Sequence, residues 1–183
     1  MDNIENEHPQ TVAVMARENQ CLLFDWGDTL MRVLPDRDGP MVTWPRVEAL
    51  PHVEDTLAQL CADWLMGLAT NAAASEEGEI WQALARVGLD RLLDKVYCYR
   101  TIGHKKPSRE FFNYILHDLK LGCESVFLIG DDFEADVMGA VRCGIRAVWL
   151  NERGGETRVG KMYRTIHDFH DLPKALEELQ AAP

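Results

Sequence analysis

The sequence predicts an α/β protein in which a parallel sheet is covered by helices on both faces, the doubly wound arrangement. Two patterns support this class. Five short, nearly continuous apolar runs alternate with segments of helical periodicity, as expected for parallel strands buried on both sides. Polar residues directly follow several of these runs, and the carboxyl ends of parallel strands meet at one edge of a sheet, where ligands bind.

The predicted strands are the apolar runs themselves. Each is four or five residues long and is bounded by polar or turn-forming residues, which suits a buried strand better than a helix. The runs cover residues 21–24, 65–69, 95–99, 126–129 and 146–150.

The predicted helices are supported by apolar residues on one face and by residues that start or stop a helix. Ser75 precedes a first turn rich in acids, Ser108 follows a proline, and Gly144 closes another helix. Four prolines make residues 31–51 an extended loop. The predicted helices cover residues 53–64, 75–87, 108–120, 134–143 and 172–180.

The length and charge of the chain narrow its class. Its 183 residues suffice for one domain with a substantial core, which we expect at residues 19–183 after a loosely held lead-in at residues 1–18. A formal net charge of −11 disfavours nucleic acid and anionic membrane surfaces as general partners. No apolar run approaches the roughly 18 residues of a membrane span, and the acidic N-terminus does not resemble a signal peptide.

The five cysteines are scattered, and no CxxC pair occurs. We therefore expect buried free thiols in a reducing cytoplasm rather than a disulfide framework or a zinc ribbon. His167 and His170 have a spacing that could suit a metal, but a polar turn before the last helix explains them better.

Three polar residues follow predicted strands: Asp25, Thr70 and Asp131. The two carboxylates could share Mg²⁺, which prefers oxygen ligands, and Asp132 and Asp136 add further oxygens nearby. The Thr70 hydroxyl could hold an anionic oxygen. We therefore expect these polar groups to converge at this edge of the sheet, where they could bind a metal ion and an anionic oxygen.

A lysine is the remaining candidate. Lys106 lies in the segment GHKKPSREFF, directly before a proline and beside Lys105. A lysine fixed at this place could neutralise a carboxylate or a phosphate as a point charge.

Four motifs in this order resemble those of the haloacid dehalogenase-like (HAD) superfamily of hydrolases. An apolar strand ending in D-x-D-x-T is similar to LLFDWGDTL, and a strand ending in Thr or Ser is similar to GLATN. A lysine followed by proline is similar to KKPSREFF, and a strand followed by G-D-D and another acid is similar to VFLIGDDFEADVMGA. The resemblance runs over residues 21–155 and implies a Rossmann-like, five-stranded sheet.

The resemblance also implies a mechanism, that of a Mg²⁺-dependent phosphatase acting on a phosphate monoester. Asp25 would be the nucleophile that forms an aspartyl-phosphate, while Thr70 and Lys106 would steady the phosphoryl oxygens. Trp26 and Asn71 are further candidates for substrate binding. The implied magnesium ligands are Asp25, the carbonyl of Gly27, and Asp131, supported by Asp132 or Asp136.

The sequence departs from the family pattern at Gly27. In family phosphatases this position is the aspartate that protonates the leaving alcohol and then activates water. A carbonyl can still bind Mg²⁺, but the acid is missing, and such an acid is typically worth about 10²–10⁴-fold in rate. Asp28, one place on, could replace it if the turn were altered.

No segment is long enough for a separate cap domain, so we expect an open site. Substrate choice would then fall to the proline-rich loop, where four residues are candidates, or to a second copy of the chain at the rim. An open site suits a phosphate at the end of a large molecule, because water is not excluded from it. The loop candidates are Arg32, Arg37, Met41 and Trp44.

Two alternatives remain open at this point. The first is a protein of the same fold that binds a phosphorylated ligand or partner and turns it over poorly or not at all, as Gly27 would suggest. The second is a dehalogenase-like hydrolase that acts at carbon. It would need no Mg²⁺, and the acids that follow Gly130 weigh against it.

Overall fold

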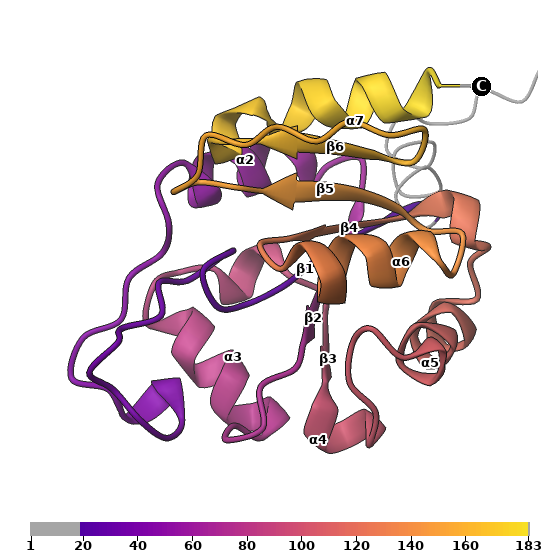
Figure 1. Ribbon diagram of the computed structural model, residues 1–183. Helices are drawn as coiled ribbons and strands as arrows, with labels where there is room; N and C mark the ends of the chain where they lie inside the picture. The colour runs from indigo at the N-terminus through magenta and orange to yellow at the C-terminus, as the bar shows by residue number, and fades with distance from the viewer. Residues whose placement is uncertain (1–18, 183) are drawn as a thin grey trace, which may run out of the picture.

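One six-stranded sheet organises the chain in the computed structural model, which describes residues 19–182 (Figure 1). The predicted lead-in at residues 1–18 lies outside this part. All neighbouring strands are parallel, in the order β3-β2-β1-β4-β5-β6. The predicted doubly wound α/β class is confirmed. The strands are β1 Cys21–Phe24, β2 Leu65–Thr70, β3 Lys95–Cys98, β4 Val126–Gly130, β5 Arg146–Leu150 and β6 Tyr163–Ile166.

Helices cover both faces of this sheet because successive side chains of each strand point to opposite sides. Leu22 and Phe24 face a buried cluster shared with α2, α3 and α7, whereas Cys21 and Leu23 face one shared with α5 and α6. The helices are α2 Val53–Leu60, α3 Glu77–Ala85, α4 Tyr99–Ile102, α5 Arg109–Leu119, α6 Gly139–Val141 and α7 Leu172–Gln180. A π-helical turn spans Phe133–Met138, and 3-10 turns span Met41–Thr43, Asp90–Leu92, Cys123–Ser125 and Phe169–Asp171.

The prediction of five strands was one short. β6 pairs in parallel with β5, from Ala147 opposite Tyr163 to Leu150 opposite Ile166. It forms an edge of the sheet, and three of its four residues are only half-buried. An edge strand needs no continuous apolar run, so the polar segment after β5 gave no strand signal.

Three predicted helices differ in detail. Helix α2 ends at Leu60 rather than at residue 64. The cap of α3 is Glu76, which shares a capping box with Glu79, whereas Ser75 is buried one residue earlier. The helix expected at residues 134–143 begins as the π-helical turn and becomes α6. The cap predicted at Ser108 is confirmed, since its side chain accepts a hydrogen bond from Phe111 N–H.

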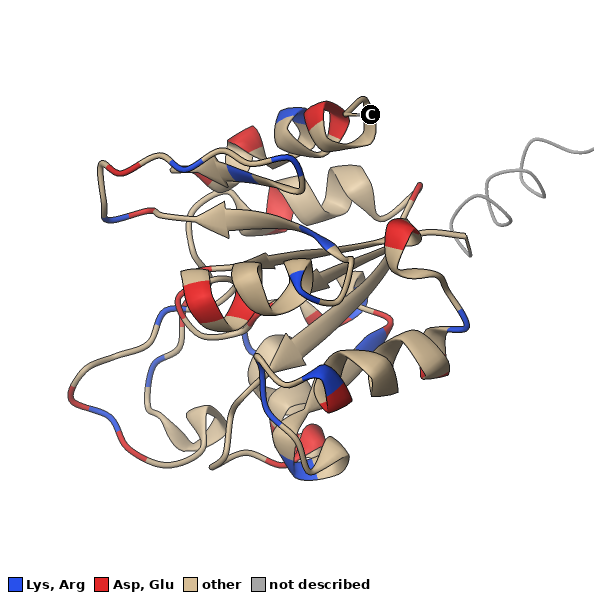
Figure 2. Cartoon of the chain, turned by 45° about the vertical axis from the view of Figure 1, so that its right-hand side comes forward, with Lys and Arg blue, Asp and Glu red and all other residues tan. Residues whose placement is uncertain are grey.

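The connections contain no separate cap domain within residues 19–182. The loop between β1 and α2 holds only the short Met41–Thr43 turn, and α3 with one 3-10 turn fills the span between β2 and β3. In the same described part, no helix is long and apolar enough to cross a membrane. Figure 2 shows acidic and basic residues interspersed along the loops and helices.

All five cysteines are free. Cys21 and Cys98 are buried as expected, but the other three are only half-buried, so the expectation of buried thiols was wrong for Cys61, Cys123 and Cys143.

Candidate active site

The candidate site lies between the carboxyl ends of β1 and β4, where the strand order reverses. In a doubly wound sheet this switch point leaves a crevice in which ligands bind. Asp25 directly follows β1, and its N–H donates to the Ile129 carbonyl at 2.8 Å, which continues the pairing with β4. Asp131 directly follows β4. The topology therefore brings together two carboxylates that are far apart in the sequence.

Lys106 joins this pair from the loop between α4 and α5. Its Nζ lies 2.6 Å from Asp25 Oδ1 and 2.6 Å from Asp136 Oδ1, and its side chain is only 1% exposed. Asn71 fixes the lysine backbone with two hydrogen bonds: its Oδ1 accepts from Lys106 N–H at 2.8 Å, and its Nδ2 donates to the Lys106 carbonyl at 2.9 Å. Asn71 therefore positions Lys106 and does not present its amide freely to a substrate.

The glycine that precedes Asp131 makes room for Asp136. A Cβ atom at Gly130 would lie 2.1 Å from Asp136 Oδ2, so a side chain there would displace that carboxylate. Asp136 Oδ2 also accepts a hydrogen bond from Asp132 N–H at 3.0 Å, which turns it toward the strand end. Asp136 is 1% exposed and is thus a buried member of the site.

Burial governs the protonation of these groups. It raises the pKa of the Asp25 carboxyl above its ordinary value, and Lys106 offsets this only in part. Partial desolvation of its carboxyl raises the pKa of Asp131 to about 6, with the charge of Asp136 adding to the effect. Burial alone would lower the pKa of the Lys106 ammonium, but the two carboxylates outweigh it and raise that pKa.

Three carboxylates fit a divalent cation. Asp25, Asp131 and Asp136 each offer an oxygen, and these atoms lie within 4.8 Å of one another. Lys106 neutralises only one of the three charges. Asp136 Oδ1 is buried, and its partner in the structure is that ammonium at 2.6 Å. Hard oxygen donors with two charges in excess suit Mg²⁺.

Neighbouring groups hold Asp131 in place. Thr29 Oγ1 donates to Asp131 Oδ1 at 3.2 Å, and Trp149 Nε1 donates to the Asp131 carbonyl at 2.8 Å. Asp132, the other expected metal ligand, is turned elsewhere: its Oδ1 accepts from Glu134 N–H and Ala135 N–H and caps the following helical turn. Of the two carboxylates expected to support the metal, Asp136 lies in the cluster with Asp25 and Asp131, whereas Asp132 serves as a cap.

The turn after β1 closes the space beside Gly27. A Cβ atom at Gly27 would lie 2.7 Å from Val33 Cγ2, so an aspartate there would have to displace Val33. Asp28 adopts a left-handed backbone, with φ of 52°, and its Oδ1 accepts a hydrogen bond from Val33 N–H at 3.1 Å. Asp28 thereby holds the side chain of Val33 over the position of the missing acid.

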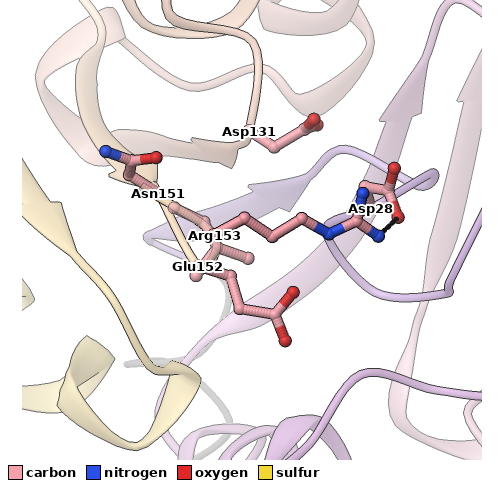
Figure 3. A pocket seen from close by; sticks show the side chains of 6 residues that line it. Asp28, Asp131, Asn151, Glu152 and Arg153 are labelled. Atoms are coloured by element: carbon pink, nitrogen blue, oxygen red, sulfur yellow. Dashed lines mark hydrogen bonds and ion pairs between the residues drawn. The ribbon is translucent and has the colours of Figure 1, made fainter. Parts of the chain in front are cut away.

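Asp28 itself lines a different cavity from Asp25. This cavity, of about 120 Å³, is formed with Asp131 and with the loop that follows β5. Figure 3 shows the Arg153 side chain extending from that loop to Asp28, and their ion pair measures 3.3 Å. Arg32 lies 3.8 Å from the same carboxylate and forms a two-pronged pair with Glu152. Asp28 is thus engaged by two arginines, Arg153 and Arg32.

A second cavity, of about 310 Å³, opens on Asp25. Thr70 lines it, and the Thr70 hydroxyl accepts a hydrogen bond from Ala72 N–H at 3.1 Å. Two of the four loop candidates, Met41 and Trp44, line it as well. Trp26 also lines this cavity, but it is only 3% exposed and its indole N–H donates to the Met31 sulfur, so most of the ring belongs to the core.

Three residues at the site were not foreseen from the sequence: Val33, Trp149 and Arg153. Val33 is an unremarkable loop residue, and its proximity to Gly27 depends on the turn geometry. Trp149 lies near the end of an apolar run, and this pattern predicts only a buried strand. Arg153 lies in a polar segment after β5, and the sole available signal was that this segment follows a strand at the functional edge.

Comparison with known proteins identifies the family. The family described as Haloacid dehalogenase-like hydrolase matches residues 34–150. The matched segment contains Thr70, Lys106 and Asp131 and begins after Asp25. The chain belongs to this family.

Individual relatives agree with this assignment. The glyceraldehyde 3-phosphate phosphatase of Methanothermobacter thermautotrophicus is 26% identical over 150 residues, covering 74% of this chain and 64% of the relative. A solved structure of an uncharacterised Listeria monocytogenes serotype 4b protein is 25% identical, with a TM-score of 0.77 over 88% of this chain and 98% of the other. A HAD phosphatase from Thermococcus onnurineus is 26% identical, with a TM-score of 0.60 over 71% and 59% of the two chains. The chain spans 43% to 64% of the length of the curated relatives it matches first.

Proposed function

We propose that this chain is a Mg²⁺-dependent phosphatase that hydrolyses a phosphate monoester through an aspartyl-phosphate on Asp25. The observation that carries the proposal is the buried cluster in which Lys106 Nζ lies 2.6 Å from both Asp25 and Asp136, beside Asp131. A nucleophilic carboxylate, a fixed cation and a divalent metal site next to a cavity are the parts that phosphoryl transfer needs. The phosphatases among its relatives support this reaction class.

Each residue has a distinct task in the proposed reaction. Asp25 attacks phosphorus, the bond to the leaving oxygen breaks, and water later cleaves the aspartyl-phosphate to release inorganic phosphate. Lys106 and the Thr70 hydroxyl donate to the phosphoryl oxygens, on which negative charge develops. Asp25, Asp131 and Asp136 would hold Mg²⁺, with the Gly27 carbonyl as a further ligand. When bound, the metal supplies positive charge that binds the phosphate and stabilises its oxygens.

The test is Mg²⁺-dependent phosphate release from p-nitrophenyl phosphate and from a panel of phosphorylated metabolites. Wild type is compared with Asp25→Asn, which removes the nucleophile, and with Asp28→Asn, which alters a carboxylate in the other cavity. We expect Asp25→Asn to abolish release and Asp28→Asn to retain most of it. Loss of activity in both variants would instead give Asp28 the role of the acid.

A second function has a specific observation in its favour. Val33 occupies the space of the family's general acid, so the chain could bind a phosphorylated ligand or a phosphorylated partner without turning it over. Inert wild-type protein that still binds Mg²⁺ and phosphate by calorimetry would favour this reading over the phosphatase. The five free cysteines suit a reducing compartment such as the cytoplasm in either case.

A further inference from the structure

The cavity beside Asp25 has a largely apolar wall. Val33, Met41 and Trp44 form it together with the alanines at residues 72–74. A pocket with an apolar lining and few polar groups binds an apolar group and uses the polar ones to orient it. Because Asp25 and Thr70 line the same cavity, a phosphoryl group held by them would place its leaving group against this wall.

This cavity offers no proton donor for the leaving group. Among the described residues that line it, Asp25 is the only one with an ionisable side chain, and Asp25 is the nucleophile. A side chain at Gly27 is blocked by Val33, 2.7 Å from the position of its Cβ atom. Asp28 lies in the other cavity and is engaged by Val33 N–H and Arg153.

The missing donor limits which leaving groups can depart. When Asp25 attacks, the electron pair of the broken phosphorus–oxygen bond stays on the leaving oxygen, which departs as an anion and takes a proton from solvent. A phenol ionises at a pKa of ~10, whereas a simple alcohol resembles water and is a far weaker acid. A phenolate can therefore leave unaided, whereas an alkoxide needs the acid that this site lacks.

We infer that the substrate is an aryl phosphate, a phosphate monoester of a phenol whose ring packs in the apolar cavity. This inference rests on the proposed function and adds its substrate class. The second step, hydrolysis of the aspartyl-phosphate, also lacks a general base, because no side chain in the cavity takes a proton from the attacking water. That proton passes to a phosphoryl oxygen instead. Hydrolysis of the aspartyl-phosphate is then slower than its formation, and the intermediate accumulates.

The first experiment compares phenyl phosphate with benzyl phosphate in the presence of Mg²⁺. Both carry one ring and differ mainly in the acidity of the leaving group. We expect wild type to favour phenyl phosphate in kcat/KM by about 10²-fold or more, the scale of a missing general acid. We also expect a burst of phenolate close to one equivalent of enzyme, with a phosphorylated protein detected by mass spectrometry after acid quenching.

A pair of variants tests whether the missing acid causes the preference for phenyl phosphate. Val33 is 40% exposed, so it tolerates a polar side chain, and Val33→Asp brings a carboxyl group to the edge of the blocked space. We expect Val33→Asp to raise activity on benzyl phosphate and to narrow the preference at least tenfold, whereas the similar Val33→Asn leaves the preference unchanged. Release from free phosphotyrosine and from a phosphotyrosyl peptide then distinguishes a small-molecule source of the phenol from a protein one.

The outcomes separate this inference from the proposed function. If wild type releases no phosphate from any substrate beyond the level of Asp25→Asn, the proposed function fails and the inference fails with it. If benzyl phosphate or glycerol phosphate is hydrolysed as fast as phenyl phosphate, the phosphatase stands and the aryl preference is overturned. Both the proposed function and the aryl preference are supported if wild type strongly prefers phenyl phosphate and shows a burst, and if only Val33→Asp reduces that preference.

Discussion

The Asn71 side chain binds the backbone of Lys106 at both its N–H and its carbonyl, at 2.8 and 2.9 Å. This pairing links the carboxyl end of β2 to the loop before α5. It fixes the start of a lysine side chain whose far end lies between Asp25 and Asp136. Asn71 directly follows Thr70, so one strand end supplies both the hydroxyl that is proposed to bind phosphate and the support for the cation.

Replacing Asn71 by alanine should therefore impair turnover through Lys106. Two hydrogen bonds are lost and the Lys106 N–H is left without its partner, which should cost about 1–3 kcal/mol of unfolding free energy. We expect Asn71→Ala to lower kcat for p-nitrophenyl phosphate at least tenfold with a smaller change in KM. Asn71→Asp retains only the acceptor for Lys106 N–H, so its kcat should lie between those of wild type and Asn71→Ala. Full turnover in a destabilised Asn71→Ala protein would show that the ion pairs alone hold Lys106.

Removing the buried cation should reveal how the cluster balances its charge. In Lys106→Met the carboxylates of Asp25 and Asp136 face each other in a buried site, and loss of one partner from such a pair costs about 3–5 kcal/mol. We expect activity to be lost. Because Mg²⁺ can replace part of the missing charge, it should raise the melting temperature of Lys106→Met more than that of wild type.

The neighbouring lysine provides a matched control for this variant. Lys105 is exposed and lies over the Tyr99 ring, away from the carboxylates. Lys105→Met should therefore melt and turn over like wild type. An equal Mg²⁺-induced shift in wild type, Lys105→Met and Lys106→Met would contradict a metal site built on Asp25 and Asp136.

Much of this arrangement could be predicted from the sequence, because topology determines it. Residues that follow parallel strands meet at one edge, which is why Asp25, Thr70 and Asp131 are close without any knowledge of side-chain contacts. The sixth strand could not be predicted, since an edge strand with half-buried residues carries no apolar run.

Loop geometry accounts for the details that the sequence did not reveal. The choice between Asp132 and Asp136 as a site residue depends on the helical turn after β4, where one carboxylate caps the turn and the other points inward. The contact of Val33 with the space beside Gly27 depends on the left-handed backbone of Asp28. Such turns are set by a few local hydrogen bonds, which residue patterns do not specify.

The pH dependence of stability should report the raised pKa values of the site carboxyls. The pKa of Asp131 is raised to about 6 in the folded protein, above the value of ~3.9 expected for an unfolded chain. Between these values the folded protein holds a proton that the unfolded chain has released, so stability from this group is present below the lower value and is lost as the pH rises through the upper one. The raised pKa of Asp25 acts in the same direction.

Metal-free wild type should accordingly lose unfolding free energy as the pH rises toward neutrality, relative to Asp131→Asn. The asparagine can still accept the Thr29 hydrogen bond but never ionises, so the variant should be the more stable protein well above pH 6 and lose that advantage in acid. Urea denaturation in a chelator, followed across the pH range, measures this difference. Saturating Mg²⁺ should reverse the order of the two proteins at neutral pH, since only wild type retains all three carboxylates.

The indole of Trp149 offers a test of how the proposed metal site is supported. Its Nε1 donates to the Asp131 carbonyl at 2.8 Å, while its ring packs against Phe133 with a centroid distance of 5.0 Å. Trp149→Phe keeps an aromatic ring but loses the hydrogen bond that orients Asp131. Groups that orient metal ligands typically contribute about 10–100-fold to metal affinity.

We therefore expect Trp149→Phe to bind Mg²⁺ about tenfold more weakly by calorimetry, with a small change in the melting temperature of the metal-free protein. Tyr163→Phe is the matched control, since Tyr163 also packs against Phe133, at a centroid distance of 5.6 Å, and the variant keeps its ring. If both variants weaken Mg²⁺ binding equally, the packing of this aromatic group, and not the bond from Trp149, sets the position of Asp131. If only Trp149→Phe does so, the single hydrogen bond from β5 orients the carboxylate that follows β4.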